Sequence, residues 1–123
     1  MRRSDFVSIS CPLTKDNRRM IGARQFALMQ PHAFFITTAR GFIHDEAALA
    51  DALRNKRIAG AGLDVWDGVE PPPADHPLLK LPNVVATPHA AGGTRDTQYL
   101  SSMTVAKQLL HVMQGNEPFH RVV

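Results

Sequence analysis

Two features of the sequence predict an α/β fold built on a parallel sheet. Four short apolar runs recur along the chain, and segments with the apolar spacing of helices lie between them. Strands that alternate with helices in this way usually run parallel. The chain has 123 residues, of which 44% are hydrophobic, so we expect it to build one modest core.

The first elements end at prolines. A strand is predicted over residues 6–9 and stops before Pro12, because proline has no N–H group to donate to a sheet. A short helix is predicted over residues 22–29 and ends before Pro31. Residues 33–37 then form the second predicted strand.

The middle of the chain carries a helix signal followed by a strand signal. Asp45 can cap a helix that runs to about Arg54, and Leu49 and Leu53 are four residues apart on one face of it. The third strand is predicted within residues 58–65.

The last part begins with a proline-rich segment, residues 70–77, which we interpret as a rigid loop. The fourth strand is predicted over residues 84–87. A final helix is predicted from near Thr94 to near Gly115, and we expect its apolar stripe to be core or interface. The stripe consists of Tyr99, Met103, Ala106, Leu110 and Met113.

Charge and composition exclude several classes of protein. The net charge of +3 is spread along the chain except for a few arginine pairs. These pairs lack interleaved aromatic residues, which predicts solvated faces and no nucleic-acid partner. Cys11 is the single cysteine, so no intramolecular disulfide can form and a reducing compartment is expected. No apolar stretch approaches the roughly 20 residues that span a bilayer, and no apolar signal core is seen, which predicts a cytoplasmic protein without a membrane partner.

Arg40, Glu70 and His89 each follow a predicted strand, and the carboxyl ends of parallel strands converge on one crevice. A guanidinium can hold a substrate carboxylate, an imidazole can move a proton near neutral pH, and a carboxylate beside the imidazole can orient it. The oxidation of a 2-hydroxy acid requires this set of groups. By residue type alone, each side chain also has a structural interpretation: a loop cation, a solvated turn acid and a hydrogen-bonded histidine.

Several motifs, in this order and spacing, resemble the D-isomer-specific 2-hydroxyacid dehydrogenases, the family of phosphoglycerate dehydrogenase, D-lactate dehydrogenase and glyoxylate/hydroxypyruvate reductase. The resemblance runs from about Ser4 to the end of the chain. Its motifs are Ser-Cys-Pro-Leu-Thr at 10–14, Thr-Ala-Arg-Gly at 38–41, Gly-Ala-Gly-Leu-Asp-Val at 60–65, Glu-Pro-Pro at 70–72, His-Pro-Leu at 76–78, Pro-Asn-Val-Val at 82–85 and Thr-Pro-His at 87–89.

The resemblance implies a role for each matching residue. Arg40 would bind the substrate carboxylate, His89 would be the acid/base and Glu70 would orient His89. Asp64 would accept a hydrogen bond from the nicotinamide carboxamide. The implied NAD(P) contacts are Cys11, Pro12 and Thr14 on the adenosine side, and Thr38, Ala39, Arg40, His89 and Gly92 toward the nicotinamide. Thr37 departs from the family, which often has asparagine at this position.

The sequence lacks the Gly-x-Gly-x-x-Gly turn with which a dinucleotide-binding domain of this type begins. The resemblance therefore implies the C-terminal half of a Rossmann-like sheet, with its N-terminal half absent. Residues 1–92 would belong to the NAD-binding domain, and residues 93–123 would form an interdomain helix and a tail that returns toward a substrate domain.

The expected function is hydride transfer between NAD or NADP and a small 2-hydroxy or 2-keto acid, although we expect the chain by itself to be an inactive fragment. The open edge of the first strand predicts a dimer or a larger assembly. The alternative function is that of the transcriptional corepressors of the same family, whose partner binding depends on NAD. Formate dehydrogenases are a third group of relatives, but they have glutamine in place of Glu70, which argues against that assignment. No metal site is expected. His76 belongs to a loop motif, and the other histidines lack partners at ligand spacing: His32, His44, His111 and His120.

Overall fold

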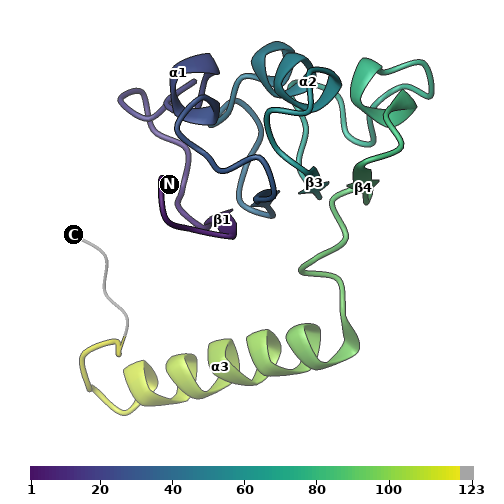
Figure 1. Ribbon diagram of the computed structural model, residues 1–123. Coiled ribbons are helices and arrows are strands. Elements are labelled where there is room, and N and C mark those ends of the chain that lie inside the picture. The colour runs from purple at the N-terminus through teal and green to yellow at the C-terminus, as the bar shows by residue number, and fades with distance from the viewer. Residues whose placement is uncertain (120–123) are drawn as a thin grey trace. The chain divides into compact units, whose positions relative to one another are not determined.

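The computed structural model describes residues 1–119, so His120 lies outside the described part of the chain. The chain divides into two units, residues 1–91 and the residues from 92 onward. The first unit alternates strands and helices, and the second contains one long helix (Figure 1). The elements in order are β1 (Phe6–Ile9), α1 (Ala23–Phe26), β2 (Phe34–Thr37), α2 (Glu46–Arg54), β3 (Gly60–Leu63), η1 (Pro77–Lys80), β4 (Val84–Ala86) and α3 (Arg95–Met113).

The four strands form one parallel sheet in the order β1-β2-β3-β4, as the alternation of elements predicts. Helices α1 and α2 lie on the same side of this sheet (Figure 1). Every strand therefore ends at the same edge of the sheet, which is the edge where the predicted site residues follow.

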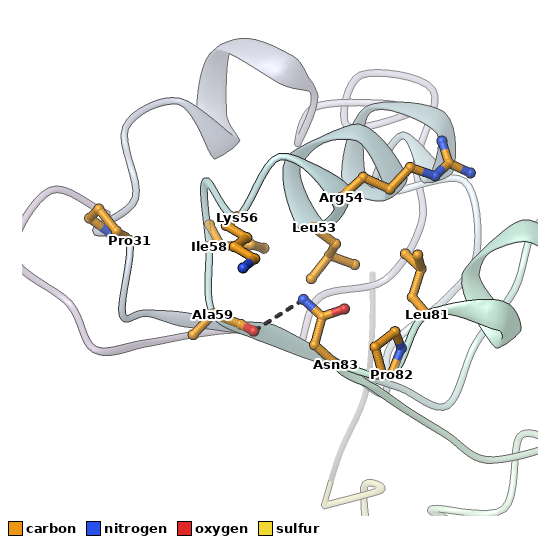
Figure 2. A pocket seen from close by; sticks show the side chains of 9 residues that line it. All are labelled: Pro31, Leu53, Arg54, Lys56, Ile58, Ala59, Leu81, Pro82 and Asn83. Carbon is orange, nitrogen blue, oxygen red and sulfur yellow. Dashed lines mark hydrogen bonds between the residues drawn. The ribbon is translucent and has the colours of Figure 1, made fainter.

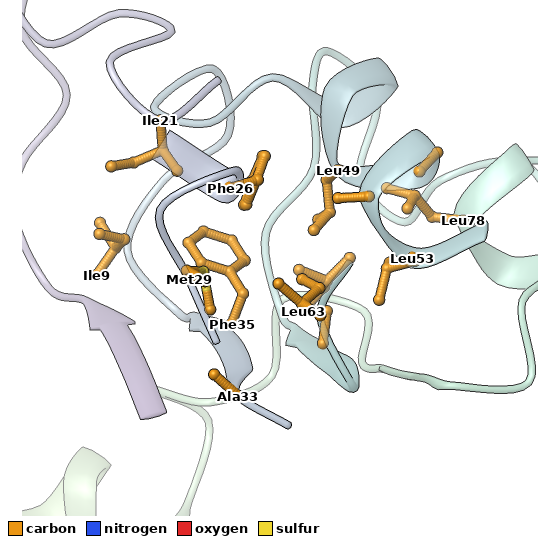
Figure 3. Close-up of a cluster of buried hydrophobic side chains, with 14 of the residues drawn as sticks. Ile9, Ile21, Phe26, Met29, Ala33, Phe35, Leu49, Leu53, Leu63 and Leu78 are labelled. Atoms are coloured by element: carbon orange, nitrogen blue, oxygen red, sulfur yellow. The ribbon is translucent and has the colours of Figure 1, made fainter. Parts of the chain in front are cut away.

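The core lies between the sheet and these helices (Figure 3). Phe26 of α1 meets Phe35 of β2 edge to face, with ring centroids 5.2 Å apart. The predicted cap of α2 is present, because the Asp45 side chain accepts the Ala48 N–H at 3.0 Å. Helix α2 then places Leu49 and Leu53 in the core, where Leu63 of β3 and Leu78 of η1 are also buried.

The opposite face of the sheet is open among residues 1–91. Phe6 and Val85 are 65% and 73% exposed, and the rings of Phe6 and Phe34 stack at 5.6 Å on this face. Parallel sheets are normally covered on both faces. The half-sheet inferred from the missing glycine-rich turn is consistent with this open face.

The structure differs from the predicted elements at two places. Helix α1 covers only four residues of the predicted 22–29. After Phe26 the hydrogen bonds join residues three positions apart, from Leu28 N–H to the Gln25 carbonyl and from Met29 N–H to the Phe26 carbonyl, and this spacing is that of turns and not of an α-helix. A short 3-10 helix, η1, begins at the end of the segment interpreted as loop.

Helix α3 begins where it was predicted to begin, near Thr94, and Thr94 caps it: its Oγ1 accepts the Thr97 N–H at 3.1 Å. None of its residues is buried within the described chain. The apolar stripe from Tyr99 to Met113 is therefore not core in the described residues, and its assignment as an interface stays a prediction. No helix in residues 1–119 has the length and apolarity needed to cross a membrane.

His44 is buried in the core beside the ring of Phe35, and neither of its ring nitrogens has a hydrogen-bond partner among the described residues. Burial lowers the pKa of His44 from 6.5 to about 4; the charges of Asp67 and Asp45 oppose this change and the charge of Arg19 adds to it. The folded chain therefore holds this imidazole neutral.

We predict that Gly41→Ala destabilises the fold far more than Gly62→Ala. A Cβ atom on Gly41 would lie 1.9 Å from the Trp66 carbonyl oxygen, whereas one on Gly62 would make ordinary contact with Ile36 at 3.8 Å. Urea denaturation should give a loss of at least about 2 kcal/mol for the first variant and less than about 1 kcal/mol for the second. Equal free energies of unfolding would contradict the close approach of residues 41 and 66.

We also predict that His44 makes stability depend on pH between about 6.5 and 4. As pH falls through this window the unfolded chain binds a proton that the folded chain excludes, so the folded state loses up to roughly 3 kcal/mol from this group. Urea denaturation of His44→Phe across this range should show a weaker pH dependence than wild type. The matched control is His32→Phe, at an exposed histidine, which should retain the wild-type dependence.

Candidate active site

Glu70 and His89 form the centre of the candidate site. His89 Nδ1 is hydrogen-bonded to Glu70 Oε2, and Glu70 Oε1 accepts the Trp66 N–H at 2.8 Å. An ionised carboxylate only accepts hydrogen bonds, so the proton of a neutral His89 lies on Nδ1 and leaves Nε2 free for other chemistry. The histidine and the carboxylate that the sequence placed 19 residues apart are thus brought together.

Glu70 is held in its charged form. Desolvation, the largest single influence, raises the pKa of its carboxyl group, but hydrogen bonds from Trp66 and His89 and the charges of His89 and Arg40 together lower it below the ordinary 4.5. The carboxylate is therefore ionised near neutral pH and can stabilise a protonated His89.

Asp64 fixes the backbone on which His89 is placed. Its Oδ1 accepts the Thr87 hydroxyl and the Ala90 N–H at 2.7 Å, and its Oδ2 accepts the Ala91 N–H at 2.9 Å. Between these anchors His89 adopts a left-handed backbone with φ of 62°, which a non-glycine residue holds only when its surroundings impose it.

The same hydrogen bonds keep the Asp64 carboxylate charged and leave it few acceptor directions for a further partner. Desolvation is the largest influence and raises the pKa of Asp64, but the hydrogen bonds from Thr87, Ala91 and Ala90 and the charge of His89 lower it overall. The residue is 3% exposed, and Oδ2 carries one hydrogen bond, so one acceptor direction is left on that oxygen.

A second part of the candidate site is a cavity formed by the residues that follow β1 and β2. This cavity of about 490 Å³ is lined by seven residues, among them five of the predicted cofactor contacts. Arg40 is exposed at its rim, with Nη1 donating to the Ala39 carbonyl at 2.6 Å. The lining residues are Ser10, Cys11, Pro12, Leu13, Thr38, Ala39 and Arg40.

Four predicted contacts lie outside this cavity lining: Asp64 and His89, described above, and Thr14 and Gly92. Thr14 is exposed and forms a local turn, in which its N–H donates to Asn17 Oδ1 at 2.8 Å. Gly92 belongs to the second unit. Asn17 was not predicted as a site residue. It donates from Nδ2 to the Pro12 carbonyl at 2.7 Å and so shapes the cavity wall. An asparagine shortly after a proline is typical of a turn, and this is the sequence signal that could have identified Asn17.

Trp66 is a further residue that sequence reasoning missed. Its indole N–H donates to the Thr87 carbonyl at 3.0 Å, while its main-chain N–H holds Glu70. Trp66 therefore links the loop of Glu70 to the segment of His89. Its type and position after a strand give no signal of this role.

Another cavity, of about 610 Å³, lies at the opposite end of the strands (Figure 2). It is lined mainly by apolar side chains, and Asn83 closes one wall by donating to the Ala59 carbonyl at 3.2 Å. None of the predicted site residues lines it. Among residues 1–119, no group of three or more histidine, cysteine or acidic side chains is placed to hold a metal ion.

Comparison with known proteins places this geometry in a family. Residues 1–91 match the family model described as D-isomer specific 2-hydroxyacid dehydrogenase, NAD binding domain. The chain is 43% identical over 116 residues to glyoxylate/hydroxypyruvate reductase B of Escherichia fergusonii, covering 94% of this chain and 36% of that protein. It is 42% identical over 114 residues to D-3-phosphoglycerate dehydrogenase of Methanocaldococcus jannaschii, covering 93% and 21%.

Solved structures give the same result. D-lactate dehydrogenase with NAD+ from Lactobacillus jensenii aligns with a TM-score of 0.83 and 33% identity, covering 99% of this chain and 40% of that one. An NADPH-dependent glyoxylate/hydroxypyruvate reductase from Sinorhizobium meliloti, in complex with NADP and sulfate, gives 0.86 and 29%, covering 98% and 39%. The chain thus spans a minor part of each relative's length, and it belongs to the D-isomer specific 2-hydroxyacid dehydrogenase family through the family's NAD binding domain.

Proposed function

We propose that this chain supplies the acid/base pair, the carboxylate clamp and part of the cofactor site of an NAD(P)-dependent oxidoreductase acting on small 2-hydroxy or 2-keto acids. The observation that carries the proposal is the hydrogen bond between Glu70 and His89 Nδ1, which leaves Nε2 of an oriented imidazole free at the strand ends. Relatives named as reductases of glyoxylate and hydroxypyruvate support the substrate class.

In this proposal His89 moves the hydroxyl proton. During reduction of a keto acid, protonated His89 gives its Nε2 proton to the carbonyl oxygen as that oxygen becomes a hydroxyl; oxidation reverses the transfer. Glu70 acts from the other side of the ring, because its carboxylate stabilises the imidazolium form and fixes the ring orientation.

Arg40 binds the substrate carboxylate. Its guanidinium offers two parallel N–H donors that match the two oxygens of a carboxylate, which a lysine could not do. Its exposure at the rim of the 490 Å³ cavity leaves it accessible to a small acid, and its charge already acts on Glu70.

When bound, NAD(P)H would supply the hydride to the carbonyl carbon during reduction, and NAD(P)+ would accept it during oxidation. The cavity beyond β1 and β2 fits part of such a cofactor, because Cys11, Pro12, Thr38 and Ala39 present small side chains and main chain to it. Asp64 would use the remaining acceptor direction of Oδ2 for the nicotinamide carboxamide. The 123 residues contain no Gly-x-Gly-x-x-Gly turn to hold the pyrophosphate, so we expect turnover only where such a turn is provided.

A chimera tests the function directly. We predict that replacing the matched segment of the E. fergusonii reductase with this chain gives a protein that reduces glyoxylate with NAD(P)H, and that His89→Ala lowers its kcat by roughly 10²- to 10⁴-fold. The matched control is His32→Ala, because His32 also pairs with an acid, Asp5 at 2.8 Å, but precedes β2 at the other end of the sheet. A folded chimera that binds NAD(P)H without turnover would contradict the proposal, as would full activity of His89→Ala.

Cofactor binding is a separate prediction for the same chimera. Titration followed by NADH fluorescence should saturate, and Asp64→Ala should weaken binding by about tenfold or more, because the variant loses both an acceptor and the anchor of the 87–91 segment. Asp51→Ala, at an exposed acid on α2, is the control. Unchanged affinity in Asp64→Ala would remove Asp64 from the cofactor site.

A further inference from the structure

Asp67 lies in the loop between β3 and Glu70, and its carboxylate reaches a distant turn. Oδ1 accepts the Phe42 N–H at 2.5 Å, and Oδ2 forms an ion pair with Arg19 Nη1 at 2.6 Å. The Asp67 side chain is only 12% exposed and the Arg19 side chain is 41% exposed, so it is the carboxylate end of the ion pair that is shielded from water. The proposed chemistry assigns no task to Asp67.

The three residues form a closed cycle of contacts. Asp67 binds both Arg19 and the Phe42 N–H, and the Arg19 N–H donates to the Phe42 carbonyl at 2.7 Å. Arg19 and Phe42 have left-handed backbones, with φ of 58° and 61°, which such residues keep only when their surroundings impose it. The Phe42 ring lies under the guanidinium of Arg18, 4.1 Å from the ring centroid.

The main chain of Asp67 is fixed independently. Its N–H donates to Glu46 Oε1 at 2.9 Å, and the other oxygen of Glu46 pairs with His76 Nε2 at 3.1 Å. Glu46 begins α2, so the loop is attached to a helix that is part of the core. The Asp67 side chain then transmits this fixed position to the turn at Phe42.

That turn carries Arg40, two residues before Phe42, and the loop carries Glu70, three residues after Asp67. We propose that Asp67 is a positioning residue: its carboxylate ties the turn that bears Arg40 to the loop that bears Glu70, and so sets the spacing of the carboxylate clamp and the acid/base pair. The proposal rests on the function proposed above, in which these two residues act on one substrate. Close packing of Gly41 on the Trp66 carbonyl places the same two segments against each other.

The test measures the pKa of the Glu70 carboxyl group by ¹³C NMR in the 123-residue chain. Removing an acid near Glu70 would by itself lower this pKa, whereas displacing Arg40 raises it, since the charge of Arg40 helps to lower it now. We expect a rise in Asp67→Ala, in the same direction as in Arg40→Ala. Asp51→Ala, which removes an exposed acid paired with Arg54 on α2, should leave the value unchanged.

A double variant separates positioning from general loosening of the loop. If Asp67 acts through Arg40, adding Asp67→Ala to Arg40→Ala produces no further rise in the Glu70 pKa. A further rise of the same size, or no rise in Asp67→Ala alone, would overturn the proposal.

The chimera gives the kinetic counterpart. Asp67→Ala should raise KM for glyoxylate by about 10- to 100-fold, because a misplaced clamp weakens substrate binding. Asp67→Asn, which keeps an acceptor for the Phe42 N–H but loses the ion pair, should lie between it and wild type. Absence of turnover in the parent chimera would count against the proposed function, while the Glu70 measurement would still decide the role of Asp67.

Discussion

The Asp64 carboxylate joins the end of β3 to the segment that follows β4, and the candidate site depends on this junction. Three hydrogen bonds from residues 87, 90 and 91 converge on one nearly buried side chain. They impose the unusual backbone of His89, which in turn points its Nδ1 at Glu70. Without a charged acceptor at this position, the segment would have to leave two main-chain N–H groups unpaired or turn them toward solvent.

The site is otherwise assembled from loops that are held by a rigid sheet. Trp66 connects Glu70 to the end of β4, and Asp67 connects the same loop to the turn after β2. Groups that follow three strands therefore share one network, with side chains after β3 and β4 and the Phe42 N–H after β2, although each lies in a different part of the sequence. Such a network explains how short strands of three or four residues can hold a constellation that needs fixed distances.

The sheet that carries this site is covered on one face only within residues 1–91. One face is packed by α1, α2 and η1, and the other exposes Phe6, Phe34 and Val85. A parallel sheet with one open face keeps much apolar surface in water, which limits the stability available from burial. The missing glycine-rich turn and the minor share of each relative that the chain covers fit the same interpretation, since both leave the cofactor site incomplete within these residues.

The sequence by itself determined the parallel sheet, the Asp45 cap, the start of α3 and the convergence of Arg40, Glu70 and His89 at one edge. These follow from local periodicity, from capping chemistry and from the rule that parallel strands end together. Only the tertiary structure decided that Asp64 holds the 87–91 segment, that Asp67 closes a cycle with Phe42 and Arg19, and that His44 is buried without a partner. Those contacts join residues 20 or more positions apart or depend on left-handed backbones at non-glycine residues, so no local pattern specifies them; they arise only when packing brings the segments together.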